Sequence, residues 1–346
     1  MKTLTMLFTL LFVSTGCYAA IAGKPVILVH GFQFTDLQNT PPNEAFLLQQ
    51  SRNYFSDYWT SRADEHHYYS SADRVSGGVK DQFKRHFERL EASGLCIQGC
   101  VWVTHSTGDL VLRDALNRLG QWGIDRNRVK VLAVIDFAGA GGGTELADLA
   151  ANVASGGGFV DFTIRQVVRA FLGVDPSSSG LGVVNDLRPT NARRIAQGNQ
   201  GVPRLRFVGT GSEFAGITKP FIQGEDDSVV PLHSACGSNR KGDYNSCSSG
   251  IRNNGVLRSA RAPSALLANH FPVLIGERVN HSQHINNDRV GGVYAPIINN
   301  VSANGLVIDF AESTGRRWWS WGARVRSVDN SNRKSMSANV YDTLNN

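Results

Sequence analysis

Three segments of this chain carry residue types that together could attack an acyl group. The first is the turn at residues 104–108, Thr-His-Ser-Thr-Gly, which is centred on Ser106. Asp227 lies in a later turn, and His281 follows it in the segment Val-Asn-His-Ser-Gln-His. A serine hydroxyl becomes a nucleophile when a histidine accepts its proton and a carboxylate orients that histidine. The three residues therefore indicate covalent acyl chemistry.

The residues around Ser106 have the pattern of a nucleophile elbow. An apolar run over residues 101–103 leads into the turn, and residues 109–119 continue with helical spacing. A strand–turn–helix context exposes the hydroxyl, and the positive end of the helix favours the negative charge that develops in the reaction. Thr104 stands where the G-x-S-x-G pattern has glycine, so an ordinary junction with an incidental serine is the alternative. The order serine, acid, histidine along the chain favours the elbow.

Other residues could take the roles of the acid and the base. They are Asp226 and Asp136 for the acid, and His284 and His270 for the base. We favour Asp227 and His281 because of the motifs that surround them. His105 is expected to be only the residue that precedes the nucleophile.

Short apolar runs alternate with amphipathic helical patterns along the chain. The runs cover residues 25–29, 101–105, 129–137 and 205–208, and residues 79–92 form a helical pattern. This alternation predicts an α/β fold, with a mostly parallel central sheet and helices on both faces. Reactive groups of such sheets gather beyond the carboxyl ends of the strands, and His30, Ser106 and Asp136 fall at or close to such ends.

Four local motifs resemble those of bacterial secreted lipases and esterases of the α/β-hydrolase fold. They are His30-Gly31-Phe32 after a strand, the pentapeptide around Ser106, the turn Asp-Ser-Val-Val at residues 227–230, and Asn-His-Ser-Gln-His-Ile-Asn at residues 280–286. The segment Gly-Thr-Glu-Leu-Ala-Asp at residues 143–148 also has a counterpart in this family. The resemblance covers about residues 24–290.

The resemblance implies a role for each matched position. Ser106 would be the nucleophile, His281 the general base and Asp227 the carboxylate that orients it. The backbone N–H groups of Phe32 and Thr107 would form the oxyanion hole. Many of these lipases hold a structural calcium ion with an aspartate at the position of Gln283. Glutamine has no carboxylate to bind the ion, so we expect no metal and no cofactor here.

The chain ends show a different composition from the middle. Residues 1–19 have a basic start, an apolar run and small residues before a cleavage point, which predicts a signal peptide and a secreted or periplasmic protein. A lipid-modified Cys17 is the alternative, which Ser14 disfavours. We expect a catalytic domain over residues 20–290, with a helical cap insertion at about residues 145–190. The fold of residues 291–346 is not predicted.

An exported chain with an even number of cysteines favours disulfide bonds. After removal of the signal peptide four cysteines remain, Cys96, Cys100, Cys236 and Cys247. They allow three pairings, of which Cys96–Cys100 with Cys236–Cys247 is the local one. A zinc site is disfavoured because paired C-x-x-C ligands are absent from the sequence.

The net charge of +6 is concentrated partly in residues 316–326, where arginines alternate with tryptophans. Such a segment could contact a lipid interface or an envelope polymer. The alternative, which we favour, is a plain β-strand with Trp319, Trp321, Ala323 and Val325 on one buried face. No nucleic-acid-binding motif accompanies the segment, so nucleic acid is not expected as a partner.

These observations predict an exported serine hydrolase that cleaves the carboxylic ester bonds of lipids, as a triacylglycerol lipase or carboxylesterase. A polyester depolymerase, a phospholipase or an acyltransferase would use the same three residues. A non-catalytic envelope-binding protein on a hydrolase scaffold is the alternative from a different class.

Overall fold

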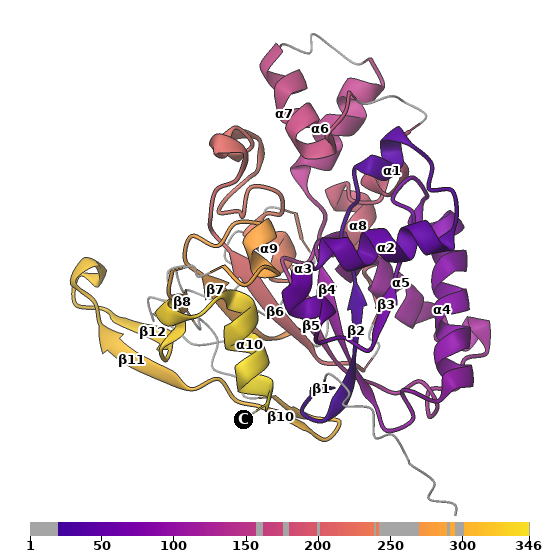
Figure 1. The fold of residues 1–346 in the computed structure, drawn as a ribbon. Helices are drawn as coiled ribbons and strands as arrows, with labels where there is room; N and C mark the ends of the chain where they lie inside the picture. Colours follow the sequence, from indigo (N-terminus) through magenta and orange to yellow (C-terminus); the bar gives the residue numbers. More distant parts are fainter. Residues whose placement is uncertain are drawn as a thin grey trace, which may run out of the picture.

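A central β-sheet organises the computed structural model of this protein (Figure 1). The structure describes residues 20–156, 162–175, 180–198, 201–238, 240–241, 270–288, 291–294 and 301–345. In sheet order the strands are β1 (Ala20–Ile21), β2 (Lys24–Val29), β4 (Cys100–His105), β5 (Val131–Phe137), β6 (Arg204–Gly209), β7 (His270–Gly276), β8 (Val293–Tyr294), β12 (Arg324–Val328) and β11 (Glu312–Arg316), with β3 (Glu65–His67) paired to β2. Strands β3, β2, β4, β5, β6 and β7 pair in parallel, whereas β1, β8, β12 and β11 pair antiparallel to their neighbours.

Side chains that alternate along the strands pack into two apolar layers, one on each face of the sheet. On β2, Ile27 and Val29 join the layer that includes Phe83 and Phe87, while Leu28 joins the layer that includes Trp59. The helices are α1 (Thr35–Gln38), α2 (Glu44–Tyr54), α3 (Ser56–Thr60), α4 (Lys80–Ser93), α5 (Thr107–Trp122), α6 (Glu145–Ala154), α7 (Phe162–Leu172), α8 (Pro189–Ile195), α9 (Leu232–Ala235) and α10 (Met336–Asn345). Because successive strand residues face opposite sides, both layers need a helical cover. The predicted α/β class is confirmed.

The carboxyl ends of the central strands meet at one edge of the sheet. Val29, the last residue of β2, lies opposite Thr104 of β4, and Thr104 lies opposite Asp136 of β5. The loops that follow these strands, which begin at His30 and at Ser106, therefore start side by side.

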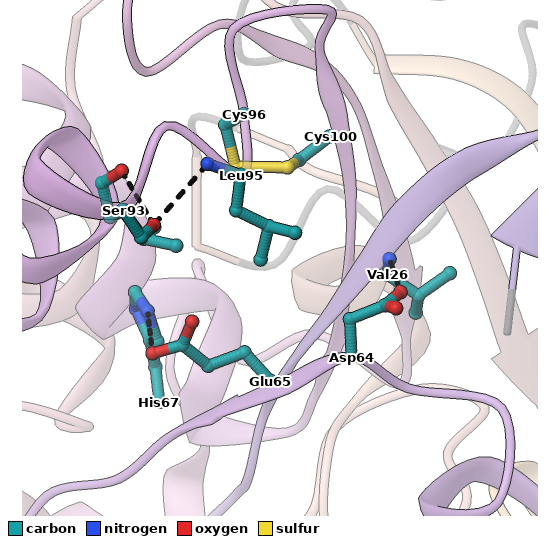
Figure 2. Close-up of a disulfide and its surroundings, with 9 residues drawn as sticks. Val26, Asp64, Glu65, His67, Ser93, Leu95, Cys96 and Cys100 are labelled. Carbon is teal, nitrogen blue, oxygen red and sulfur yellow. Dashed lines mark hydrogen bonds and ion pairs between the residues drawn. A yellow bond between two sulfur atoms is a disulfide. The ribbon is translucent and has the colours of Figure 1, made fainter. Parts of the chain in front are cut away.

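A disulfide bond between Cys96 and Cys100 closes the loop that leads into β4 (Figure 2). Closing so short a loop stabilises a fold by about 2 kcal/mol in the chain-entropy account. The bond fixes the entry to the strand that leads to Ser106. Cys236 is also disulfide-bonded, but Cys247 lies outside the described residues, so the second predicted pairing stays a prediction.

Helices α6 and α7 lie within residues 145–190, where a cap insertion is predicted, and Figure 1 shows them together at the top of the molecule. Their role as a cap stays a prediction. Thr144 begins α6: its Oγ1 accepts a hydrogen bond from the N–H of Leu146 at 3.3 Å and donates one to the carbonyl of Val229 at 2.6 Å. On α7, Val167, Val168 and Leu172 are buried, whereas Phe162 is 75% exposed.

The C-terminal residues add strands to the sheet and cover one of its faces. Strand β12 pairs with β8, and the hairpin β11–β12 extends the sheet at that side. The prediction of one continuous strand through Trp319, Trp321, Ala323 and Val325 is wrong. The chain makes a helical turn at Trp318–Ser320 and β12 begins only at Arg324, so Trp321 is 97% exposed.

Residues 1–19 lie outside the described part of the chain, so the signal peptide stays a prediction. Among the described helices, none is both long and apolar enough to cross a bilayer.

Candidate active site

Ser106 occupies a tight turn between β4 and α5. Its backbone has φ 55° and ψ −124°, a combination that residues other than glycine rarely adopt. Three hydrogen bonds hold it there. The N–H of Ser106 donates to the carbonyl of Phe137 at 3.0 Å, and the carbonyl of Ser106 accepts from the N–H groups of Ala140 at 2.9 Å and Asp109 at 3.2 Å. This is the strained strand–turn–helix geometry of a nucleophile elbow.

Two glycines allow the chain to pack closely around this turn. A Cβ atom on Gly108 would lie 2.5 Å from the carbonyl oxygen of Val29. A Cβ atom on Gly31 would overlap Oη of Tyr54 and would lie 2.8 Å from Cβ of Ser106. Real Cβ atoms do not approach neighbours this closely, so both positions require glycine.

The structure brings His281 and Asp227 together. Nδ1 of His281 lies 2.8 Å from Oδ2 of Asp227, and the N–H of His281 donates to the Asp227 carbonyl at 3.0 Å. The other carboxylate oxygen of Asp227 accepts from the N–H groups of Val229 and Val230, at 3.0 Å and 2.8 Å. Both carboxylate oxygens of Asp227 thus have partners, and these hold the carboxylate toward the imidazole.

Burial and charge act in opposite directions on the pKa values of this pair. Burial alone would raise the pKa of Asp227, but His281 and the backbone amide of Val230 hold it below its ordinary value. Burial alone would lower the pKa of His281, but the Asp227 carboxylate raises it above its ordinary value. An aspartate of this kind orients a histidine and stabilises its protonated form.

The alternative acids and bases have other surroundings, although Asp226 and His284 lie close to Asp227. Oδ1 of Asp226 accepts from the N–H of Ser228 at 2.7 Å, and Asp136 contacts Thr104 and Arg206 behind the turn. His284 is fully buried with Nε2 at 3.8 Å from Asp227. His270 begins β7, at the amino end of that strand.

Ser106 and His281 line the same cavity, which has a volume of about 560 Å³. Its wall also includes Phe32 and Thr107, the two residues predicted to supply oxyanion donors. Within the described residues, their backbone N–H groups donate to no other group. Ser106 precedes α5, so the positive end of this helix points to the same place.

Apolar side chains form much of the remaining wall of this cavity. They are Phe34, Phe171, Leu187, Phe214, Val229, Val230 and Ile285. Phe171 comes from α7, and its ring centroid lies 5.9 Å from that of Phe32. Helix α7 thus supplies part of the wall of the cavity that Ser106 lines.

Tyr54 and His105 connect the turn to the backbone of His281, a link that the sequence analysis did not anticipate. Oη of Tyr54 lies 2.5 Å from Nδ1 of His105, and Nε2 of His105 lies 2.9 Å from the carbonyl oxygen of His281. Burial, together with His281 and His284, holds the pKa of His105 far below its ordinary value, so its ring is neutral. Since a carbonyl only accepts, Nε2 carries the proton and Nδ1 accepts from the tyrosine hydroxyl. Tyr54 therefore orients His105, and His105 in turn holds the backbone of His281.

Gln283 does not present an oxygen to a metal ion. Its Oε1 accepts from the N–H of Asn280 at 3.0 Å, and its own N–H donates to Oδ1 of Asn280 at 3.0 Å. In the part of the chain that the structure describes, no three His, Cys, Asp or Glu residues lie close enough together to hold a metal. The absence of a calcium ion at this loop therefore stays a prediction.

No family model and no curated protein sequence matches this chain. Solved structures that resemble it include the mature Bacillus licheniformis lipase BlEst2, at 15% identity over 61% of this chain and 78% of that one, with a TM-score of 0.41. Lipase 1 from Pelosinus fermentans is 14% identical over 75% and 92% of the two chains, with a TM-score of 0.40. The Staphylococcus hyicus lipase is 12% identical over 76% and 88%, with a TM-score of 0.38. The function proposed below rests on the geometry of the site itself.

The raised pKa of His281 leads to a prediction about pH. A general base must be neutral, so hydrolysis should fall as the pH falls through the pKa of His281, and the acid limb of kcat/KM should have its midpoint above 6.5. Asp227→Asn should move this limb to lower pH and reduce kcat by roughly ten thousandfold. Asp226→Asn is the matched control, because it removes a carboxylate from the same turn without touching His281. If the midpoint of the acid limb were the same in Asp227→Asn as in the wild type, the assignment of Asp227 as the partner of His281 would be contradicted.

A second prediction concerns the link through Tyr54. Tyr54→Phe removes the donor to His105, and the loss of one buried hydrogen bond should lower kcat by about tenfold with little change in KM. Tyr58→Phe on α3 is the control, since the Tyr58 ring packs on Arg62 and Trp59 outside the cavity. Steady-state kinetics separate the two parameters. A raised KM with unchanged kcat would show instead that Tyr54 acts on the substrate.

The loop at Gln283 gives a third prediction. Treatment with a chelator should leave hydrolysis and the thermal midpoint of unfolding unchanged, because the Asn280–Gln283 contacts close this loop without a metal. A large loss of activity that added calcium restores would refute this account of the loop.

Proposed function

We propose that this chain is an exported serine hydrolase that cleaves the carboxylic ester bonds of lipids, as a lipase or carboxylesterase. The observation that carries the proposal is the placement of Ser106 on a strained turn, in the same cavity as a histidine that is bound to Asp227. This arrangement provides nucleophile, base and orienting acid from three separate loops.

In the proposed reaction, Oγ of Ser106 attacks the ester carbonyl carbon and its proton passes to Nε2 of His281. The tetrahedral intermediate collapses as His281 returns this proton to the leaving alcohol, which leaves an acyl group on Ser106. Water then attacks the acyl-enzyme with His281 again as base, and the carboxylic acid is released. Asp227 remains ionised throughout, which agrees with its lowered pKa.

The negative charge on the carbonyl oxygen would be bound by the backbone N–H groups of Phe32 and Thr107. Each such donor typically contributes about 3 kcal/mol to the stability of the transition state. Because backbone donors at a turn are already oriented, little reorganisation is needed during the reaction.

The apolar wall of the cavity supports a lipid substrate. Phe171 and Leu187 of the proposed cap line one part of this wall. Val229 and Val230, which come directly after Ser228 in the turn of Asp227, line another part. An acyl chain would therefore lie between the cap and this turn. Water would be the acyl acceptor in a hydrolase, and a second alcohol in an acyltransferase. An exported protein would meet such substrates outside the cytoplasm.

A direct experiment compares the wild type with Ser106→Ala on p-nitrophenyl acetate, butyrate, octanoate and palmitate. The wild type should hydrolyse these esters, and Ser106→Ala should reduce kcat by at least about ten thousandfold. Ser155→Ala, at an exposed position after α6, is the control. A preference for the longer chains supports a lipase. Activity that persists in Ser106→Ala would contradict the assigned nucleophile.

A further inference from the structure

The hairpin β11–β12 ends in a turn that holds two tryptophans almost entirely in solvent. Trp318 is 94% exposed and Trp321 is 97% exposed, whereas the next most exposed large apolar side chain among the described residues, Phe162, is 75% exposed. We call residues 316–324 the hairpin tip. Figure 1 shows that this hairpin projects away from the rest of the molecule at the left. Tryptophan rings are seldom left in water, because they are the largest apolar side chains.

Local hydrogen bonds fix the shape of the hairpin tip. The hydroxyl of Ser320 is buried and lies 2.8 Å from the carbonyl of Arg317 and 2.6 Å from that of Ala323. Trp319 is partly buried, with its ring centroid 6.3 Å from that of Tyr294. Trp321 has φ 49°, a left-handed conformation that is unfavourable for a tryptophan. One tryptophan thus anchors the tip, and the other two face outward.

Beyond Glu312 at its first position, the hairpin carries only positive charge. From residue 313 to residue 328 the chain has four arginines and no acidic residue. Arg316 and Arg324 stand directly opposite each other in the hairpin, and like charges in such a pair repel. Within the described residues, Arg326 pairs with Glu312 at 3.7 Å, but Arg316 and Arg324 form no ion pair.

We propose that the hairpin tip docks the protein on an anionic lipid surface. Trp318 and Trp321 would enter the layer of lipid headgroups, where tryptophan rings are preferentially found, and Arg316 and Arg324 would face the lipid phosphates. The tip is a convex end of a hairpin and not a groove, which suits a broad surface. A neutral polymer could stack on the tryptophans but would leave the opposed arginines without counter-charges. This docking site is separate from the cavity of Ser106, so the proposal does not depend on the proposed catalysis.

The test measures co-sedimentation of the full-length protein with vesicles of ether-linked phosphatidylcholine, alone or mixed with an equal part of ether-linked phosphatidylglycerol. Ether-linked lipids hold no acyl ester, so hydrolysis does not disturb the assay. The wild type should bind the mixed vesicles, and Trp318→Ala with Trp321→Ala should abolish binding. Arg316→Gln with Arg324→Gln should weaken it by roughly thirtyfold, since each basic residue at an anionic surface contributes about 1 kcal/mol.

Two control variants separate the hairpin tip from other surfaces. Phe162→Ala removes the exposed aromatic side chain of α7, and Arg52→Gln with Lys130→Gln removes two exposed charges elsewhere; both should bind as the wild type does. Circular dichroism and hydrolysis of p-nitrophenyl acetate should be unchanged in the tip variants, because the tip contributes no residue to the cavity.

Several results would overturn the proposal. They are equal binding to vesicles without phosphatidylglycerol, wild-type binding by the tryptophan variant, loss of binding in Phe162→Ala alone, or no binding by the wild type. If the protein hydrolysed no ester, the proposed function would fail while the vesicle assay could still succeed, so the two failures are distinguishable.

Discussion

The backbone of Ser106 is held in a conformation that a serine adopts only under constraint. Residues in such sparsely populated regions cost about 1–3 kcal/mol, which the surrounding structure must offset. Here hydrogen bonds to Phe137 and from Ala140 fix both sides of the turn, and the close contact at Gly108 leaves the helix no freedom to withdraw. The packing of the buried strands β4 and β5 offsets this strain. The constrained turn then sets the position of the Ser106 hydroxyl.

A buried network of charges supports the turn from below. Asp109, in the first turn of α5, contacts Arg113 of the same helix at 3.0 Å and the arginines of β6, Arg204 at 2.7 Å and Arg206 at 3.0 Å. Burial alone would raise the pKa of Asp109, but these arginines lower it, so its carboxylate stays ionised. Asp109 also accepts from the N–H of Gly141 at 3.1 Å. Removal of one partner from such a network is costly, because it leaves an uncompensated charge in the interior.

The same network accounts for the threonine at position 104. Oγ1 of Thr104 donates to Oδ1 of Asp136 at 2.8 Å, and the other oxygen of Asp136 pairs with Arg206. A glycine at this position would leave that carboxylate oxygen without its donor. Threonine in place of the usual glycine therefore connects β4 to Asp136 of β5 and, through it, to Arg206 of β6.

The sequence predicted the features that depend on local pattern. The strands that end at Val29 and at His105 each contain a short apolar run, and the turns around Ser106, Asp227 and His281 have short characteristic motifs. These patterns sufficed for the α/β class and for the candidate residues, whose roles stay proposals.

Features that depend on tertiary packing could not be predicted in this way. The contact of Tyr54 with His105 joins the end of α2 to β4, and no periodicity in either segment indicates it. The alternation from Trp319 to Val325 resembled a strand, but the buried hydroxyl of Ser320 stabilises a turn instead. The strands β11 and β12 carry few apolar residues and β8 has only two residues, so their place in the sheet is decided by their partners.

The central claim, that Ser106 attacks an acyl carbon with His281 as base, is tested most directly by covalent capture. The protein is treated with a p-nitrophenyl alkylphosphonate, which reacts with an activated serine to give a stable adduct, and the modified peptide is identified by mass spectrometry. The account predicts one adduct per chain, on Ser106, formed much more slowly in Asp227→Asn. An enzyme that hydrolyses esters but carries the adduct on another residue, or carries none, would contradict it.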